Sequence, residues 1–129
     1  MGGSITLKLL ETHPERLLSV TSGGSTGFRA SDTTEQWDSA FVKKLVAGEP
    51  LSQAMLETAP PDYAKLGGRP VPTLLIVGEQ DNPGRFAELR AAMPAAEFVV
   101  VPGARHGSVP DAAQFLAALR SFLQRHDQR

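Results

Sequence analysis

The sequence contains no cysteine, so several kinds of chemistry are excluded at once. It can have no disulfide framework, no thiol nucleophile and no cysteine metal site. No apolar run approaches the roughly 18 residues of a membrane span. The first residues also lack the cationic start and apolar stretch of a secretory signal. By default, these absences favour a cytoplasmic location and give no reason to expect a membrane partner.

The sequence also lacks an excess of charge of either sign. It has 13 basic and 14 acidic residues, for a formal net charge of −1. This balance gives no basic footprint for nucleic acid or for an anionic membrane. The stretch Gly23–Gly27 is glycine-rich but lacks the lysine and the following helix of a phosphate loop, so we expect no nucleotide cofactor. With 129 residues, 41% of them hydrophobic, we expect one domain over residues 1–129 with a modest core.

Apolar runs and helical stripes alternate along the chain. Thr73–Val77 is uniformly apolar between Pro72 and Gly78, as in a strand with both faces covered. The order of elements predicts the α/β class, with about three parallel strands flanked by helices and joined by right-handed crossovers. In chain order, we expect a helix at Ile5–Glu11, a strand at Leu17–Thr21, the strand Thr73–Val77, a helix at Arg85–Met93, a strand at Phe98–Val101 and a helix at Asp111–His126.

Residues 23–68 interrupt this alternation. Their first part is polar and glycine-rich, which predicts a loop. Two small helices are expected after it, around residues 37–46 and 51–56, before Pro60 and Pro61. Trp37, Phe41 and Met55 could line a pocket there, although a stripe of apolar side chains at helical spacing more often packs against a sheet.

Two residues that follow predicted strands carry the clearest chemistry. Asp81 follows the strand Thr73–Val77 by a Gly-x-x-Asp turn, and His106 follows Phe98–Val101 by a Gly-x-x-His turn. Because the carboxyl ends of parallel strands meet at one edge of a sheet, these side chains can meet if the strands are neighbours. A carboxylate bonded to one imidazole nitrogen leaves the other nitrogen free to act as a general base.

Each of these residues also has a simpler explanation when taken alone. An aspartate before Asn82-Pro83-Gly84 is a common turn former. A histidine in a glycine-bounded loop is often only a solvated surface residue. Their order, their matching positions after successive strands and their spacing favour a shared catalytic origin.

The text from Val71 to Asp81, followed by Val101–Gly107 and an amphipathic terminal helix, resembles the C-terminal half of the α/β-hydrolase fold superfamily. The resemblance implies a partial fold whose strands are equivalent to strands 6 to 8, with residues 23–68 as a reduced helical cap. Family members order their triad as nucleophile, acid, histidine, and the serine sits in a Gly-x-Ser-x-Gly elbow. Met1-Gly2-Gly3 looks like the part that follows this serine, so Met1 would supply an oxyanion-hole N–H. A cloning remnant or flexible leader is the alternative.

The resemblance implies a serine-type hydrolase of esters or similar small uncharged substrates, with Asp81 as the acid and His106 as the base. Lactones, amides, epoxides and halides stay open as substrates, and no metal or cofactor is implied. Ser4 lacks the preceding strand and strained turn of an elbow serine, and the other serines have loop or capping roles. We therefore expect a chain that keeps two triad members, lacks the nucleophile and is inactive alone.

Two further hypotheses stay open. One is a noncatalytic truncated or split-gene module that associates through its exposed sheet edge. Its partner would be a second copy, forming a homo-oligomer, or a complementing N-terminal half. The other is a complete small doubly wound domain, flavodoxin-like or receiver-like, although the phosphate loop or acidic pocket that such domains need is absent from the sequence.

Overall fold

A computed structural model of the chain describes residues 2–24, 47–48, 50, 60–81 and 83–126. At its centre lies a sheet of three parallel strands, in the order β1 (Val20–Gly23), β2 (Thr73–Gly78) and β3 (Glu97–Val101). The middle strand pairs with both neighbours, from Thr73 opposite Val20 on one side and from Leu74 opposite Glu97 on the other. This sheet confirms the predicted parallel α/β architecture.

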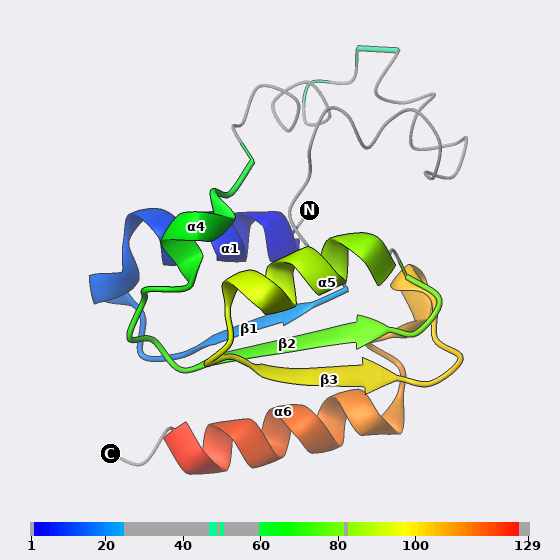
Figure 1. The fold of residues 1–129 in the computed structure, drawn as a ribbon. Coiled ribbons are helices and arrows are strands. Elements are labelled where there is room, and N and C mark those ends of the chain that lie inside the picture. The colour runs from blue at the N-terminus through cyan, green and yellow to red at the C-terminus, as the bar shows by residue number, and fades with distance from the viewer. Residues whose placement is uncertain (1, 25–46, 49, 51–59, 82, 127–129) are drawn as a thin grey trace.

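Helices cover both faces of the sheet (Figure 1). The helices α1 (Gly2–Thr12), α4 (Tyr63–Leu66) and α5 (Pro83–Ala92) lie on one face, and α6 (Ala113–His126) lies on the other. None of the helices in the described part of the chain combines the length and the apolar character that crossing a bilayer requires.

The core consists of two apolar clusters that the sheet separates. Every residue of β2 is buried, because this strand has a neighbour on each side and helices on both faces. Side chains alternate along it, so Leu75 packs towards α1 and α5, whereas Leu74 and Ile76 pack towards Phe122 of α6. A fully buried leucine or phenylalanine contributes about 1.5–3 kcal/mol, so these clusters hold the strand ends firmly.

The first strand begins later than its sequence suggested. We expected Leu17–Thr21, but β1 runs from Val20 to Gly23. The segment before it is a 3-10 helix, Pro14–Arg16, and Leu18 is 65% exposed. Leu17 and Leu18 therefore lead into the strand, whereas Gly23 lies inside it, opposite Ile76. Pairing with β2, rather than local apolar character, sets these limits.

The short helix α4 was not predicted from the sequence. The helix α4 has only four residues, but it is well capped, because the Asp62 side chain accepts the N–H of Ala64 at 3.1 Å. Its Leu66 is buried against the cluster around α1. The buried carboxylate of Glu11 connects α1 to α4, because it accepts the backbone N–H of Asp62 at 3.1 Å. The same carboxylate also accepts a hydrogen bond from the Lys8 ammonium at 2.8 Å.

The last helix starts two residues later than expected, at Ala113 rather than Asp111. Ser108 does not cap it, because the preceding 3-10 helix His106–Ser108 uses this side chain to bond Arg105. The bounds of β2, α5 and β3 agree with the expected ones to within two residues, whereas α1 begins at Gly2, three residues before the expected start at Ile5. The two small helices expected around residues 37–46 and 51–56, and most of the expected cap, lie outside the described residues.

Candidate active site

Asp81 and His106 meet beyond the carboxyl ends of β2 and β3. The distance between His106 Nδ1 and Asp81 Oδ2 is 3.1 Å, which is a hydrogen bond. The Asp81 side chain is only 14% exposed, whereas that of His106 is 54% exposed. The acid therefore sits beneath the histidine, and the ring keeps an open side towards solvent. The expected meeting of the two side chains is present, while their catalytic role stays a prediction.

The glycine that ends β2 lets the two loops approach each other. A Cβ at Gly78 would lie 2.4 Å from the backbone oxygen of Ala104 and 2.8 Å from its carbonyl carbon. No other residue type fits there without moving the backbone. Gly78 therefore allows the loop that carries His106 to cross directly over the start of the loop that carries Asp81.

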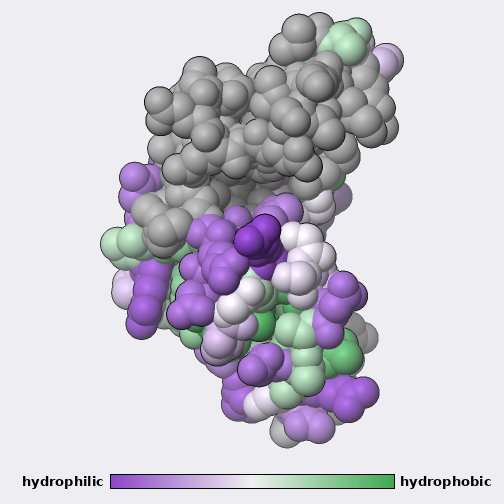
Figure 2. Space-filling model, turned by 90° about the vertical axis from the view of Figure 1, so that its right-hand side faces the viewer, coloured by the Kyte–Doolittle hydropathy of each residue, from purple (hydrophilic) through white to green (hydrophobic). Residues whose placement is uncertain are grey.

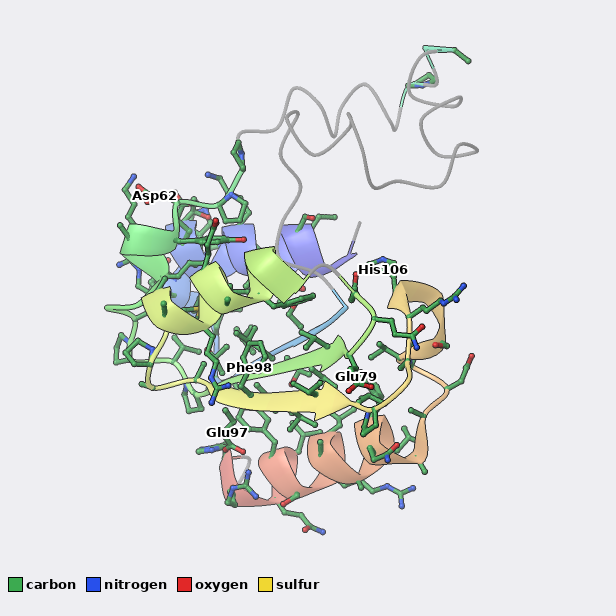
Figure 3. All side chains as sticks on the ribbon, turned by 45° about the vertical axis from the view of Figure 1, so that its right-hand side comes forward. Asp62, Glu79, Glu97, Phe98 and His106 are labelled. Carbon is green, nitrogen blue, oxygen red and sulfur yellow. The ribbon has the colours of Figure 1, made fainter. Side chains whose placement is uncertain are left out.

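A series of hydrogen bonds continues from the sheet into these loops. The N–H of Glu79 donates to the Val101 carbonyl, and that of Gln80 donates to the Ala104 carbonyl, both at 3.0 Å. The Glu79 side chain accepts the N–H of Gly103 at 2.8 Å. The Gln80 side chain accepts Arg105 Nε at 3.0 Å. In Figure 3, Glu79 and His106 both lie at the carboxyl end of the sheet, far from Glu97.

The first strand also reaches this site. Gly24 follows β1 with a left-handed φ of +63°, and its N–H donates to the Ile76 carbonyl at 2.7 Å. A Cβ at Gly24 would lie 3.4 Å from His106 Nδ1. Each of the three strands is thus followed by one residue of the candidate site: Gly24 after β1, Asp81 after β2 and His106 after β3.

The surroundings of His106 favour its protonated form. The hydrogen bond with Asp81 raises the pKa of the imidazole above its ordinary value of 6.5. Burial opposes this rise, the negative charge of Asp81 adds to it, and the positive charge of the amino terminus opposes it again. A backbone hydrogen bond with Gly24 also raises this pKa.

The first helix points its N-terminal end at the same edge of the sheet. In Figure 1, α1 starts near the side where the strands end and runs back across the face. Viewed onto this side in Figure 2, hydrophilic residues gather in the middle of the described surface, and apolar residues lie below them towards α6.

This arrangement can support proton transfer. With Asp81 bonded to Nδ1, the ring is held in the tautomer that carries its proton on Nδ1, so Nε2 presents a lone pair. Such a nitrogen can take a proton from a hydroxyl group, and the carboxylate stabilises the imidazolium that forms. Within the described residues, no cluster of three or more His, Asp or Glu side chains is suited to hold a metal ion.

The other candidate residues fall elsewhere. Met1, Trp37, Phe41 and Met55 lie outside the described residues. Ser4 is in the first turn of α1, and Ser22 is buried in β1. The remaining histidines make their own contacts away from Asp81, since His13 Nδ1 lies 3.5 Å from Glu15 and His126 Nε2 lies 3.4 Å from Glu97.

The sequence did not predict that Glu79, Gln80 and Gly24 contribute contacts to this site. They join side chains to loop backbone or backbone to a ring, and such contacts leave no periodic pattern. The only available signal was the matching Gly-x-x-Asp and Gly-x-x-His spacing, which places Asp81 three residues after Gly78 and His106 three residues after Gly103.

Comparison with known proteins gives one family. The model of the alpha/beta hydrolase family matches residues 6–119. Comparison with curated protein sequences gives no match.

Solved structures share the fold. One is MGS-MChE2, an alpha/beta hydrolase enzyme from a sediment metagenome of the Mar Chica lagoon, Morocco, with a TM-score of 0.71 and 20% identity over 98% of this chain and 59% of that one. NosK from Streptomyces actuosus has a TM-score of 0.64 and 18% identity over 98% of this chain and 66% of that one. A structure from the ammonia-oxidizing thaumarchaeon Nitrososphaera gargenis has a TM-score of 0.71 and 17% identity over 95% and 61%, respectively. The chain thus spans between 59% and 66% of the length of these structures.

Proposed function

The chain belongs to the alpha/beta hydrolase family, and on that premise we propose that it carries the acid and the histidine of a Ser-His-Asp hydrolase. Asp81 orients the ring and stabilises the imidazolium, and His106 removes the proton from the attacking hydroxyl. The observation that carries the proposal is the 3.1 Å contact between these two side chains at neighbouring strand ends.

The substrates we propose are esters or similar small uncharged molecules. The Nitrososphaera gargenis structure is described together with carboxylesterases, and MGS-MChE2 is described as an alpha/beta hydrolase enzyme. The triad chemistry suits this class, because a serine activated by histidine attacks an acyl carbon and forms a covalent acyl-enzyme.

The serine belongs, in this proposal, at the N-terminal end of α1. The family order of nucleophile, acid and histidine requires it ahead of Asp81, and the elbow serine opens a helix. The direction of α1, which starts near the edge where the strands end, supports this position. Met1 would then offer its N–H to the oxyanion. Without that serine, Asp81 and His106 can supply only general-base catalysis, so we expect residues 1–129 by themselves to be slow or inactive.

The test combines genetics with active-site labelling. The genomic sequence upstream of Met1 is examined for an in-frame Gly-x-Ser, and the polypeptide that includes it is treated with a fluorophosphonate probe. We expect labelling of the serine directly ahead of α1, and loss of labelling in His106→Ala. Mass spectrometry of the labelled peptide separates this serine from Ser4 and Ser25. Labelling that survives His106→Ala unchanged contradicts the proposal.

The 129-residue chain offers a second, independent measurement. Hydrolysis of p-nitrophenyl acetate by this chain would depend on the neutral imidazole and rise with pH through the raised pKa of His106. Asp81→Asn should move that rise to lower pH, because the contact that raises the pKa is lost. An activity that is equal in wild type and His106→Ala would show that His106 is not the base.

A noncatalytic role through the sheet edge is the second candidate. In the part of the chain that the structure describes, β1 has β2 as its only strand neighbour. Apolar side chains lie close by in sequence, with Ile5 55% and Leu9 43% exposed on α1 and Leu18 65% exposed before β1. Such an edge favours association with a second copy or with a complementing N-terminal half. Sedimentation of wild type and Leu18→Lys tests this, since only an edge-mediated oligomer dissociates in the variant.

A further inference from the structure

The Asp81 to His106 contact depends on how the two loops are aligned, and neither residue fixes that alignment. Asp81 and His106 lie 25 residues apart in the sequence, and their side chains meet from two different loops. The sheet ends before them, at Gly78 and Val101. Something beyond the sheet must therefore hold the two loops in register.

Glu79 supplies one such connection. Its Oε2 accepts the backbone N–H of Gly103 at 2.8 Å, so the carboxylate of the acid loop bonds the turn of the histidine loop. Gly103 has a left-handed φ of +66°, which marks the point where the chain turns towards His106. A bond from a carboxylate to a backbone N–H is charge-assisted and stronger than a neutral one.

Gln80 supplies the other connection. Its Oε1 accepts Arg105 Nε at 3.0 Å, directly beside His106 in the chain. Its own N–H donates to the Ala104 carbonyl at 3.0 Å. Arg105 is further held by Ser108 Oγ, which accepts the Arg105 N–H at 2.9 Å. The neighbours of Asp81 thus bond the neighbours of His106, residue by residue.

We propose that Glu79 and Gln80 are positioning residues, which hold the His106 loop against the Asp81 loop through Gly103 and Arg105 and so set the distance between acid and histidine. This inference rests on the proposed function of the pair. Glu79 and Gln80 act through other residues and take no proton themselves. A 1 Å misplacement is enough to spoil a catalytic hydrogen bond, so small losses of alignment have large effects.

The test measures the titration of His106 by NMR in the 129-residue chain. Asp81→Asn gives the reference for a lost contact, and His106→Ala identifies the resonance. Gln80→Ala removes the acceptor for Arg105 without changing any charge. Glu79→Ala removes both charge and acceptor, whereas Glu79→Gln removes the charge and keeps an acceptor. Gln114→Ala on the exposed surface of α6 is the matched control.

We expect the His106 pKa to fall towards its ordinary value in Gln80→Ala, and to fall further in Glu79→Ala than in Glu79→Gln. A merely structural role would lower the melting temperature and leave this pKa in place, because a folded molecule would keep its contact with Asp81. Gln114→Ala should change neither quantity.

The outcomes separate the two proposals. If Asp81→Asn lowers the pKa but Gln80→Ala and Glu79→Ala do not, the positioning role is wrong and the proposed catalytic pair survives. If Asp81→Asn itself leaves the pKa unchanged, the pair is wrong and both proposals fail. Should Glu79→Ala not fold, Gln80→Ala and Glu79→Gln still decide the result.

Discussion

Replacing Gly78 by alanine should separate the two loops that build the site. The added Cβ would stand 2.4 Å from the Ala104 oxygen, whereas ordinary contact begins at 3.4 Å, so the backbones must part by about 1 Å. This movement stretches the bond from the Gln80 N–H to the Ala104 carbonyl, now 3.0 Å. It also displaces the loop two residues before His106.

The expected cost follows from these contacts. Overpacking of this kind costs about 1–3 kcal/mol, and one lost backbone hydrogen bond adds about 0.5–1.5 kcal/mol. Together they predict a free energy of unfolding lower by about 1.5–4.5 kcal/mol. The assay is urea unfolding followed by circular dichroism, in which the midpoint should fall while the slope stays constant.

Gly68→Ala is the matched control, because a Cβ at Gly68 meets nothing within 4 Å. It should change the free energy by no more than about 0.5 kcal/mol. If Gly78→Ala unfolds at the same urea concentration as wild type and keeps the His106 resonance in place, the close approach of the loops is not what Gly78 provides.

Three other predictions concern stability. Phe122→Ala removes a fully buried ring from the cluster beneath the sheet and should cost about 3–5 kcal/mol in urea unfolding; a loss below 1 kcal/mol would contradict that packing. Because the pKa of His106 is raised, its bond with Asp81 stabilises the fold fully below pH 6.5 and loses this contribution as pH rises through the folded pKa, so Asp81→Asn should be costly near pH 6 and far less so near pH 9. The bond with Arg125 lowers the pKa of Glu97, so its contribution is present above pH 4.5 and is lost as pH falls through the folded pKa. Arg125→Ala should still cost less than about 1 kcal/mol at pH 7, since both side chains are largely exposed, and a larger loss would point to a wider network.

The sequence was most informative where burial is complete. The run Thr73–Val77 predicted β2 almost to its ends, because a strand covered on both faces is apolar throughout. The amphipathic terminal helix was predicted for a related reason, because only one face of α6, which carries Phe115 and Phe122, meets the sheet. The two strand ends then placed Asp81 and His106 at one edge, since parallel strands end together.

Prediction was weaker where a distant partner decides the outcome. The limits of β1 depend on its pairing with β2, so the apolar residues Leu17 and Leu18 led to a predicted start that was three residues too early. The helix α4 is too short to show a period and depends on the Asp62 cap and on Glu11. The contacts of Glu79 and Gln80 join side chains to a loop that lies more than 20 residues further along the chain, where local pattern carries no information.

The order of the strands has a consequence for how the chain folds and how it can vary. The pair β2 and β3, with Asp81 and His106, closes over a short connection through α5, whereas β1 joins β2 across a connection more than twice as long. Closing a flexible loop costs only about 0.6 kcal/mol more for each doubling of its length. The acid and the histidine are thus brought together by the shorter of the two connections. The segment between β1 and β2 can lengthen or shorten at little entropic cost, without disturbing the pair.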